Sequence, residues 1–415
     1  MSRISPERRA CFAILRDWQP ESGDYLEQII EGECRADPGL NRAFILNMCF
    51  GVGRNISLLD HWIEHLTDGP RRLDSRTRWL CRQGLYELRL TTTADHAAVN
   101  ETVSMGGKAR GLTNALLRRA IREADLLDQL TDEAPLAIRF SHPEFLVDRW
   151  TENFGATITE EVCKNAQRPS EVFVRENLLK PPRSGALEEF GEPLADHPGF
   201  WRVNLLPREL LSEGQVYAQD PSTIESCILL QAEAGHRVLD TCAAPGGKTA
   251  LVAQMMENRG EIVATDPKPQ RLKRLGKNLD RLGVKIANCI AHEWGEQAPE
   301  DEAFNGGFDR ILIDAPCTNS GVLRRRVDAR WRLRPSDFDK MAELQSAILA
   351  DTAQLLRPKG RLVYSTCSID HEENRAIVDA FIDKNPDWVA GEERLVLPRG
   401  DAFDGAYAVA LERKS

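Results

Sequence analysis

The chain of 415 residues lacks the features that would place it in a membrane, in an oxidising compartment or around a zinc ion. No run approaches the roughly 18 apolar residues of a membrane-spanning helix, so we expect no membrane span. Residues 1–9 lack the apolar core of a secretion signal. The ten cysteines are scattered, with no C-x-x-C pair and no Cys/His cluster of zinc type. We therefore expect a cytoplasmic protein with reduced thiols and no metal site.

An overall excess of positive charge is also missing. The formal net charge is −10, which argues against a protein covered by nucleic acid. The basic residues nevertheless form three clusters: Lys108, Arg110, Arg118, Arg119 and Arg122; Arg71, Arg72, Arg76, Arg78 and Arg82; and Arg324, Arg325, Arg326, Arg330, Arg332 and Arg334. Guanidinium groups suit phosphate oxygens, so each cluster is a candidate RNA contact; the alternative is a solvated helix surface.

The hydrophobic pattern divides the chain into three parts. Residues 1–135 show apolar residues at helical spacing only, which predicts a small helical bundle. Residues 141–235 contain proline breaks and one strand-like run, which indicates a small connecting α+β subdomain. In residues 236–415, strand-like runs alternate with helical ones. This alternation is typical of parallel βαβ units in a doubly wound α/β sheet.

The third part allows individual elements to be predicted. Strands are expected at 237–240, 261–266, 311–314 and 362–366, and helices at 249–256, 270–282, 341–356 and 372–383. The ligand site of such a sheet lies at the carboxyl ends of its strands.

Two cysteines follow strand-like runs in this part of the chain. Asp314 ends one run and Cys317 follows it, while Cys367 comes directly after Leu362–Thr366. Because the carboxyl ends of parallel strands share one edge, we expect the two thiols and the carboxylate to face one cleft. A single such cysteine is more often a small buried hydrophobe, and Asp314 alone could cap a turn. The combination favours covalent chemistry.

A glycine turn joins the first predicted strand to the first helix. It reads Cys242-Ala243-Ala244-Pro245-Gly246-Gly247-Lys248-Thr249. Glycines let a ligand approach the backbone, and a helix N-terminus favours negative charge. The turn nearly matches a phosphate-binding loop, but Cys242 stands where that loop needs its first glycine, so a phosphate-loop NTPase is the weaker alternative. Asp266 ends the second strand, where an acid holds ribose hydroxyls in Rossmann-like sheets; the alternative is a helix N-cap.

These motifs together resemble the RsmB/NOP-type (Fmu/Sun) RNA cytosine-5 methyltransferases. The matching runs are 238–249, Asp314-Ala315-Pro316-Cys317, Ser365-Thr366-Cys367-Ser368, Gln219-Asp220-Pro221-Ser222, 278–283 and Glu372-Glu373-Asn374. The helical part resembles the NusB-like N-terminal domain of this family through residues 96–103 and 114–119. The resemblance covers nearly the whole chain. It implies a Rossmann-like class I methyltransferase sheet preceded by an all-helical, RNA-binding NusB-like domain.

The resemblance also implies a cofactor and the residues that hold it. The residues expected around S-adenosylmethionine are Cys242, Ala243, Ala244, Pro245, Gly246, Gly247 and Lys248. Asp266 would hold the ribose, and Asp314 would lie beside both the cofactor and the target base. Glu293 would contact the adenine, although the family commonly has Asp there.

The same resemblance implies the reaction. Cys367 would attack carbon 6 of cytosine, Cys317 would assist product release, and the substrate would be RNA, with small-subunit ribosomal RNA first. We also expect a monomer.

The chemistry explains why a thiolate is needed. Addition to carbon 6 breaks the ring conjugation and makes carbon 5 nucleophilic, and the reactive form of cysteine is the thiolate. A helix expected to begin near Asp370 would offer its positive end to Cys367, and Asp314 would supply a proton to ring nitrogen 3 or bind the exocyclic amine. Two further alternatives remain. The first is DNA cytosine methylation with Cys317 as nucleophile, a reaction that needs no second cysteine. The second is a catalytically idle RNA-binding factor, which needs neither of the two cysteines.

Overall fold

The computed structural model describes residues 4–19, 23–69, 73–295, 301–400 and 403–414, within a chain that forms two compact units. Unit 1 comprises residues 1–168 together with 323–333, and unit 2 comprises residues 169–322 and 334–415. The division into 1–135, 141–235 and 236–415 stays a prediction.

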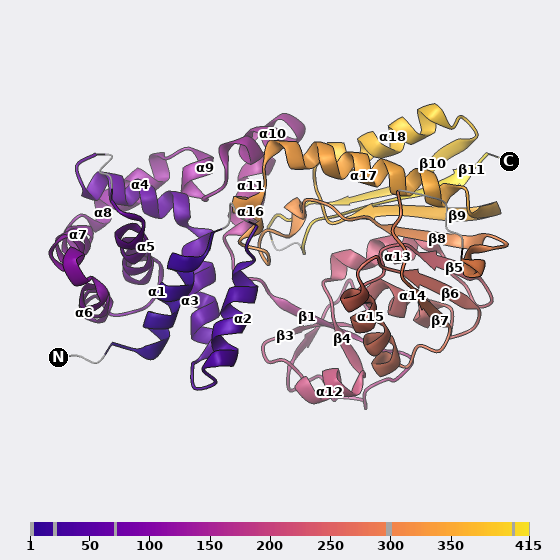
Figure 1. The fold of residues 1–415 in the computed structure, drawn as a ribbon, viewed down its shortest axis with the longest axis horizontal. Helices are drawn as coiled ribbons and strands as arrows, with labels where there is room; N and C mark the ends of the chain where they lie inside the picture. The colour runs from indigo at the N-terminus through magenta and orange to yellow at the C-terminus, as the bar shows by residue number, and fades with distance from the viewer. Residues whose placement is uncertain (1–3, 20–22, 70–72, 296–300, 401–402, 415) are drawn as a thin grey trace. The chain divides into compact units, whose positions relative to one another are not determined.

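The regular secondary structure in the described residues of unit 1 is helical (Figure 1). For residues 1–135 this is what the apolar spacing predicts; the helices at 144–166 and 329–332 lie beyond that range. The helices of unit 1 are α1 (Pro6–Asp17), α2 (Leu26–Ala36), α3 (Arg42–Arg54), α4 (Ile56–Leu66), α5 (Ser75–Leu90), α6 (Asp95–Met105), α7 (Arg110–Arg122), α8 (Ala124–Glu133), α9 (Leu136–Arg139), α10 (Glu144–Phe154), α11 (Ala156–Ala166) and α16 (Ala329–Arg332). Several helices begin with a side-chain cap: the side chains of Ser5, Asn41 and Asp74 accept hydrogen bonds from backbone N–H groups of the first turns of α1, α3 and α5.

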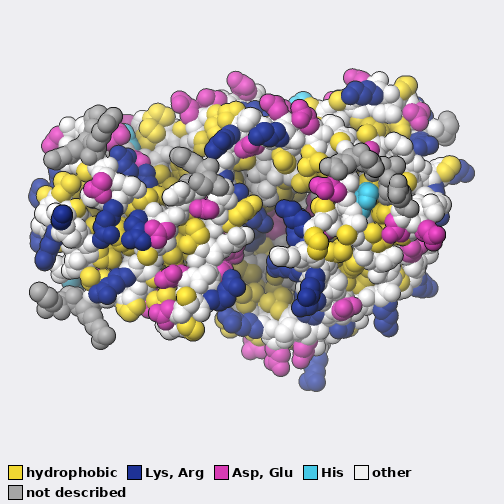
Figure 2. Space-filling model, viewed as in Figure 1, with side chains coloured by type: hydrophobic (Ala, Val, Ile, Leu, Met, Phe, Trp, Pro, Cys, Tyr) yellow, Lys and Arg dark blue, Asp and Glu magenta, His cyan; other side chains and the backbone are white. Residues whose placement is uncertain are grey.

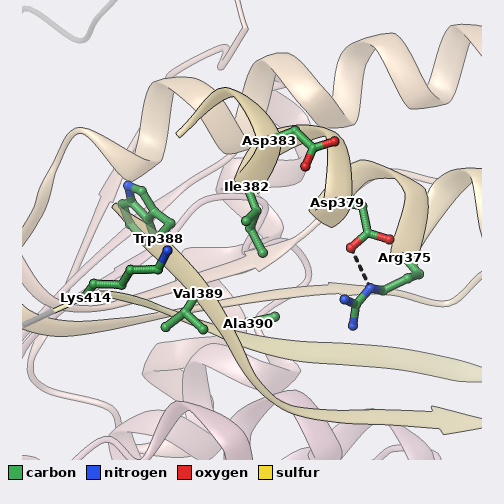
Figure 3. A pocket seen from close by; sticks show the side chains of 8 residues that line it. All are labelled: Arg375, Asp379, Ile382, Asp383, Trp388, Val389, Ala390 and Lys414. Carbon is green, nitrogen blue, oxygen red and sulfur yellow. Dashed lines mark hydrogen bonds and ion pairs between the residues drawn. The ribbon is translucent and has the colours of Figure 1, made fainter. Parts of the chain in front are cut away.

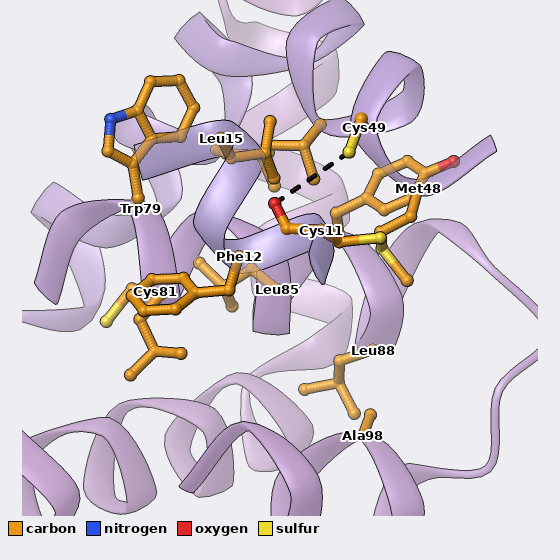
Figure 4. Close-up of a cluster of buried hydrophobic side chains, with 14 of the residues drawn as sticks. Cys11, Phe12, Leu15, Met48, Cys49, Trp79, Cys81, Leu85, Leu88 and Ala98 are labelled. Atoms are coloured by element: carbon orange, nitrogen blue, oxygen red, sulfur yellow. Dashed lines mark hydrogen bonds between the residues drawn. The ribbon is translucent and has the colours of Figure 1, made fainter. Parts of the chain in front are cut away.

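The core of unit 1 forms where α1, α3 and α5 bury their apolar faces (Figure 4). Cys11, Cys49 and Cys81 are fully buried there among leucine, methionine and aromatic side chains. Burial raises the pKa of Cys81 to about 12, so this thiol stays protonated. These three cysteines are small apolar core residues.

A short piece of chain far along the sequence completes unit 1. Arg330, in α16, is fully buried and has no carboxylate partner in the described part of the chain. Its guanidinium instead donates to the carbonyl oxygens of Ser141 at 3.1 Å and Ala166 at 3.1 Å. These carbonyls lie just beyond α9 and at the last residue of α11. The negative ends of these helices therefore stabilise the buried cation.

Unit 2 contains two sheets. The smaller has the order β2-β3-β1-β4, built from β1 (Val172–Glu176), β2 (Gly191–Pro193), β3 (Phe200–Val203) and β4 (Val216–Ala218), with α12 at Arg208–Glu213. The larger has the order β10-β11-β9-β8-β5-β6-β7. Its strands are β5 (Arg237–Asp240), β6 (Glu261–Thr265), β7 (Ala287–Ile290), β8 (Phe308–Asp314), β9 (Leu356–Thr366), β10 (Trp388–Val396) and β11 (Ala406–Arg413).

Helices cover both faces of the seven-stranded sheet (Figure 1). On one face lie α13 (Glu225–Leu230), α14 (Gly247–Met255) and α15 (Pro269–Leu282), and on the other lie α17 (Pro335–Ala353) and α18 (Arg375–Lys384). Side chains alternate along each strand: Leu312 packs with the first set, and its neighbours Ile311 and Ile313 pack with the second. This confirms the doubly wound α/β fold.

The strands predicted from the hydrophobic pattern omit both edges of the sheet, β7 at one and β10 with β11 at the other, and the predicted starts of α17 and α18 differ from those in the structure. β5 to β9 pair in parallel, but β11 pairs antiparallel with β9, and β10 pairs antiparallel with β11. Helix α17 begins at Pro335 rather than residue 341, because Pro335 suits a first helical position and Asp337 accepts a hydrogen bond from the Arg334 N–H at 2.9 Å.

We predict that Arg330→Met destabilises unit 1. The substitution removes the charged donor from the Ser141 and Ala166 carbonyls and from those of Phe140 and Leu323, each 3.4 Å away. This costs about 3 kcal/mol of unfolding free energy. Urea unfolding followed by circular dichroism checks this. Arg326→Met is the matched control, because Arg326 lies in the same segment with its side chain exposed. Equal unfolding midpoints for the two variants would contradict the anchoring role of Arg330.

Candidate active site

The site begins with the pairing of β8 and β9. These strands run parallel with Asp314 opposite Ser365, so both polypeptides leave the sheet at the same edge. Ser365 Oγ lies 3.4 Å from Asp314 Oδ1. Just beyond the strand ends, the Sγ atoms of Cys317 and Cys367 lie 3.1 Å apart. The fold therefore brings the two thiols and the carboxylate to the same edge of the sheet, as the sequence predicts.

The environment of Cys317 favours its protonated form. A hydrogen bond with Cys367, burial and the nearby charge of Glu373 raise the pKa of the Cys317 thiol well above its ordinary value. Both cysteines are half-buried, unlike the core cysteines of unit 1. A thiol that keeps its proton next to a second sulfur is suited to donate to that sulfur.

Asn319 links the two cysteines. Its Nδ2 donates to the Cys317 carbonyl oxygen at 2.8 Å, and its Oδ1 lies 3.4 Å from Cys367 Sγ. The side chain stands on a left-handed residue with φ of 64°, a conformation that asparagine tolerates better than most residues. Sequence reasoning did not identify Asn319 in this role; the only signal was its position two residues after Cys317.

Asp314 forms an ion pair with Lys248. The alternation of β8 puts Asp314 on the same face as Leu312, and Lys248 stands in the first turn of α14 on that face. Burial by itself would lower the pKa of Lys248, but the charge and hydrogen bond of Asp314 outweigh it and raise that pKa above its ordinary value. Because Lys248 is paired with a carboxylate, it is not free to bind phosphate as the lysine of a phosphate-binding loop does.

The glycine turn Cys242–Lys248 is held by protein packing. Gly246 has φ of 105°, and a Cβ there would lie 2.9 Å from Leu275. A Cβ on Gly247 would lie 2.7 Å from the Tyr217 ring. The sequence suggested glycines for the approach of a ligand. In the structure, the positive φ of Gly246 and the Tyr217 ring beside Gly247 already favour glycine at these two positions.

Asp240 and Asp266 lie at the ends of neighbouring strands beside this turn. Asp240 Oδ2 accepts from the Thr249 hydroxyl at 2.7 Å, while its buried Oδ1 has no hydrogen-bond partner. Asp266 is almost fully buried; it accepts from Lys268 N–H at 3.0 Å and pairs with Arg271 at 3.3 Å. The orphaned acceptor on Asp240 fits a ligand that brings donors, as the amino acid part of S-adenosylmethionine does.

Arg271 is a further residue that the sequence did not point to. From α15 it reaches both Asp266 and the carbonyl of Ala244, which it contacts at 2.8 Å, and so ties the second strand end to the turn. Glu293, the predicted adenine contact, is exposed after β7. Its neighbour Trp294 is buried and donates to Thr265 Oγ at 2.8 Å. The role of Glu293 stays a prediction.

The helix after Cys367 begins later than expected. A 3-10 turn spans His371–Glu373 and α18 begins at Arg375, not near Asp370. Asn374 at the N-cap position accepts from Thr366 Oγ at 2.6 Å, so the helix is tied to the end of β9. The positive end of α18 therefore lies several residues further from Cys367 along the chain than the sequence suggested.

The three arginine clusters have different environments. Arg330 is buried and Arg332 pairs with Asp328 at 3.0 Å, so neither presents a free cation to phosphate. Arg82 pairs with Asp60 at 2.6 Å. Arg71 and Arg72 lie outside the described residues. In the cluster around α7, Arg110, Arg118 and Arg122 are exposed. On the face drawn in Figure 2, basic and acidic side chains are interspersed.

Other kinds of site are absent from the described ranges. They hold no group of three or more His, Cys, Asp or Glu side chains arranged to bind a metal ion. None of their helices has the length and apolar character needed to cross a membrane. A surface hollow beside α18 and β10, lined by residues including Arg375, Trp388 and Lys414, contains none of the predicted site residues (Figure 3).

We predict that Asp240 makes stability depend on pH. Burial raises its pKa from 3.8 to about 7, with the Thr249 hydrogen bond opposing the shift. The folded protein therefore holds this proton more tightly than the unfolded chain, and the stability so gained at low pH is lost as pH rises toward 7. Asp240→Asn imitates the protonated form at every pH. Relative to this variant, the unmutated protein should lose about 3 kcal/mol between pH 5 and pH 8.

Urea unfolding of both proteins without cofactor measures this difference. Parallel pH profiles would show that Asp240 is ionised in the folded state.

Comparisons with known proteins agree with this geometry. The family described as 16S rRNA methyltransferase RsmB/F matches residues 227–408, and the NusB family matches residues 5–122. Ribosomal RNA small subunit methyltransferase B of Salmonella newport (strain SL254) is 34% identical over 95% of this chain and 96% of its own length. The protein of the same name from Klebsiella pneumoniae (strain 342) is 35% identical, with the same two coverages.

Solved structures show the same fold. PH0851 aligns with a TM-score of 0.74 at 25% identity, covering 99% of each chain. NSun6 from Pyrococcus horikoshii, solved with SFG, aligns with a TM-score of 0.59 at 21% identity, over 66% of this chain and 98% of that one. The chain therefore belongs to the RsmB/F family of 16S rRNA methyltransferases, which use S-adenosylmethionine, and it carries a NusB-family domain before the methyltransferase sheet.

Proposed function

We propose that the protein methylates carbon 5 of cytosine in small-subunit ribosomal RNA through a covalent bond between Cys367 and carbon 6. The observation that carries this proposal is the 3.1 Å separation of the Cys317 and Cys367 sulfurs beside Asp314. Relatives that match nearly the whole chain are named for methylation of ribosomal RNA, which supports the substrate class. Action on this RNA places the protein in the cytoplasm, and we expect a monomer.

The first step needs a thiolate at Cys367. Its addition to carbon 6 forms a carbon–sulfur bond and leaves carbon 5 electron-rich, while a proton or hydrogen bond at ring nitrogen 3 neutralises the developing charge. Asp314 is partly exposed at the same sheet edge and paired with Lys248. As a carboxylate it can accept a hydrogen bond from the exocyclic amine of the base, and once it has taken a proton from the Lys248 ammonium it can donate to ring nitrogen 3. The bound cofactor supplies the electrophilic methyl group, and residues 242–248 with Asp266 hold it.

The environment of Cys317 suits it to the release step. Cys317 keeps its proton because of the hydrogen bond with Cys367, burial and nearby negative charge. After methyl transfer, a water molecule acting as base takes the carbon 5 proton, and the electron pair of that C–H bond forms the double bond between carbons 5 and 6. The carbon–sulfur bond breaks, and its electron pair returns to the Cys367 sulfur. The Cys317 S–H lies 3.1 Å from that sulfur and can donate to it. This favours Cys367 as nucleophile and Cys317 as the residue that assists release.

The exposed side of α7 supplies a surface for RNA phosphates. Arg110, Arg118 and Arg122 recur at multiples of four residues, so they lie along one side of the helix. α7 contains no acidic residue, and none of these three has a carboxylate partner in the described part of the chain. Arg119 differs, because it pairs with Asp68 and Glu123 at 2.7 Å each. The three exposed arginines therefore fit RNA phosphates better than Arg119 does.

We predict opposite behaviour of the two cysteine variants. Cys317→Ala should form a covalent complex with RNA that persists on a denaturing gel, because release fails after the bond has formed. Cys367→Ala should form none and should lose methylation by several orders of magnitude. The measurement incubates each full-length protein with ribosomal RNA and S-adenosylmethionine. Reversed roles would indicate DNA-type chemistry. Methylation by the unmutated protein without any adduct in either variant would refute the covalent mechanism.

We also predict that Arg110→Gln, Arg118→Gln and Arg122→Gln together weaken RNA binding and flatten its salt dependence. Each phosphate contact to single-stranded RNA contributes about 0.7 to the slope of log affinity against log salt, so the slope should fall by up to about 2. Cofactor affinity should not change. Arg119→Gln, which removes the same charge from the same helix, should leave the slope as it is. If the slope falls equally in the triple variant and in Arg119→Gln, the exposed side of α7 is not part of the RNA interface.

A further inference from the structure

We propose that Glu373 is a positioning residue that holds the backbone around Cys317 and thereby sets the rate of product release. This inference rests on the proposed function, because it concerns the step assigned to Cys317.

Glu373 is a buried carboxylate whose partners converge on one short segment. It lies in the 3-10 turn after β9 and is fully buried. Its Oε1 accepts from the Thr318 backbone N–H at 2.8 Å, and its Oε2 accepts from the Thr318 hydroxyl. Gln345 Nε2 donates to Oε1 at 3.1 Å. Within the described residues Glu373 has no cationic partner, so these donors are what compensate its buried charge.

The same network holds both peptide groups of Cys317. Gln345, itself fully buried on α17, also donates from Nε2 to the Pro316 carbonyl oxygen at 2.8 Å. Pro316 O belongs to the peptide before Cys317, and Thr318 N belongs to the peptide after it. One amide and one carboxylate, linked to each other, therefore fix the backbone on each side of the thiol.

The turn that carries Glu373 is itself fixed to the sheet. The Tyr364 hydroxyl, from the middle of β9, donates to the Glu373 carbonyl oxygen at 2.6 Å. Tyr364 belongs to β9, which ends at Thr366, directly before Cys367. β9 therefore positions both sulfurs. It carries Cys367 just beyond its end, and through Tyr364 and Glu373 it also fixes the backbone of Cys317.

The charge of Glu373, like its hydrogen bonds, favours a protonated and well-positioned Cys317. It adds to the hydrogen bond with Cys367 and to burial in keeping the pKa of Cys317 raised. A carboxylate that can only accept also selects the donor groups of Thr318, so the segment has one favoured orientation. Removal of this acceptor leaves the Thr318 N–H and hydroxyl buried without a partner.

The test measures formation and decay of the covalent RNA complex separately. Glu373→Gln keeps the size of the side chain but replaces one acceptor oxygen by an NH2 group. We expect S-adenosylmethionine affinity and the rate of adduct formation to change little, and adduct decay to slow by about tenfold or more, since a misplaced reactive group can lose up to about 100-fold in rate. The complex should therefore accumulate, as in Cys317→Ala.

Three further variants make the result specific. Thr318→Val removes one hydroxyl donor without changing the charge, and it should slow adduct decay less than Glu373→Gln does. If Glu373→Gln does not fold, Thr318→Val tests the proposal in its place. Thr318→Ser retains the donor and should restore decay. Glu343→Gln makes the same change of charge on the exposed side of α17, two residues from Gln345, and should behave like the unmutated protein.

The outcomes separate this inference from the proposed function. If Cys317→Ala accumulates the adduct while Glu373→Gln and Thr318→Val release it at the unmutated rate, the positioning role is wrong and the covalent mechanism stands. If Glu373→Gln slows formation and decay equally, Glu373 acts on general stability and the inference is overturned. If no protein forms an adduct that depends on Cys367, both proposals fail together.

Discussion

The parallel pairing of β8 with β9 is the constraint on which the rest of the site depends. With Asp314 opposite Ser365, Cys317 follows three residues later on one chain segment and Cys367 follows two residues later on the other. The register therefore determines which side chains meet at the sheet edge. A slip of one residue would turn Ser365 to the opposite face and separate the two sulfurs. The buried apolar side chains that alternate along both strands prevent this slip, so the hydrophobic core specifies the geometry of the chemistry.

The protein stabilises its buried charges in four different ways, and each way suits a different task. Arg330 donates to carbonyl oxygens at helix ends. These hydrogen bonds anchor the segment 323–333 in unit 1 without a carboxylate partner. Lys248 and Asp314 neutralise each other at the carboxyl edge of the sheet. Asp240 is instead neutralised by a proton at neutral pH and below, because burial raises its pKa to about 7 in spite of the Thr249 hydrogen bond. Glu373 is surrounded by donors from Thr318 and Gln345, so its charge serves to orient neighbours.

The cysteines show how position decides the use of one residue type. Five of them are buried, and the pKa of Cys81, Cys163 and Cys227 is raised to about 12 by burial, which leaves them chemically inert. Cys317 and Cys367 instead follow strand ends, where the backbone leaves the sheet and side chains become partly accessible. Parallel sheets create such an edge in any doubly wound fold, and this chain places two thiols and a carboxylate on it.

The sequence by itself determined the helical first part, the βαβ alternation and the convergence of Asp314, Cys317 and Cys367. It also located β5, β6 and β8 within three residues of their ends, and the C-terminal half of β9. These features depend on local periodicity and on the rule that parallel strands share a carboxyl edge. The tertiary structure alone decided that Lys248 pairs with Asp314, that Arg271 joins Asp266 to the turn, and that Glu373 and Gln345 hold the Cys317 segment. It also decided that residues 323–333 belong to unit 1 and that β10 and β11 run antiparallel. These contacts join residues far apart in the chain, and no local pattern specifies which buried polar groups will meet.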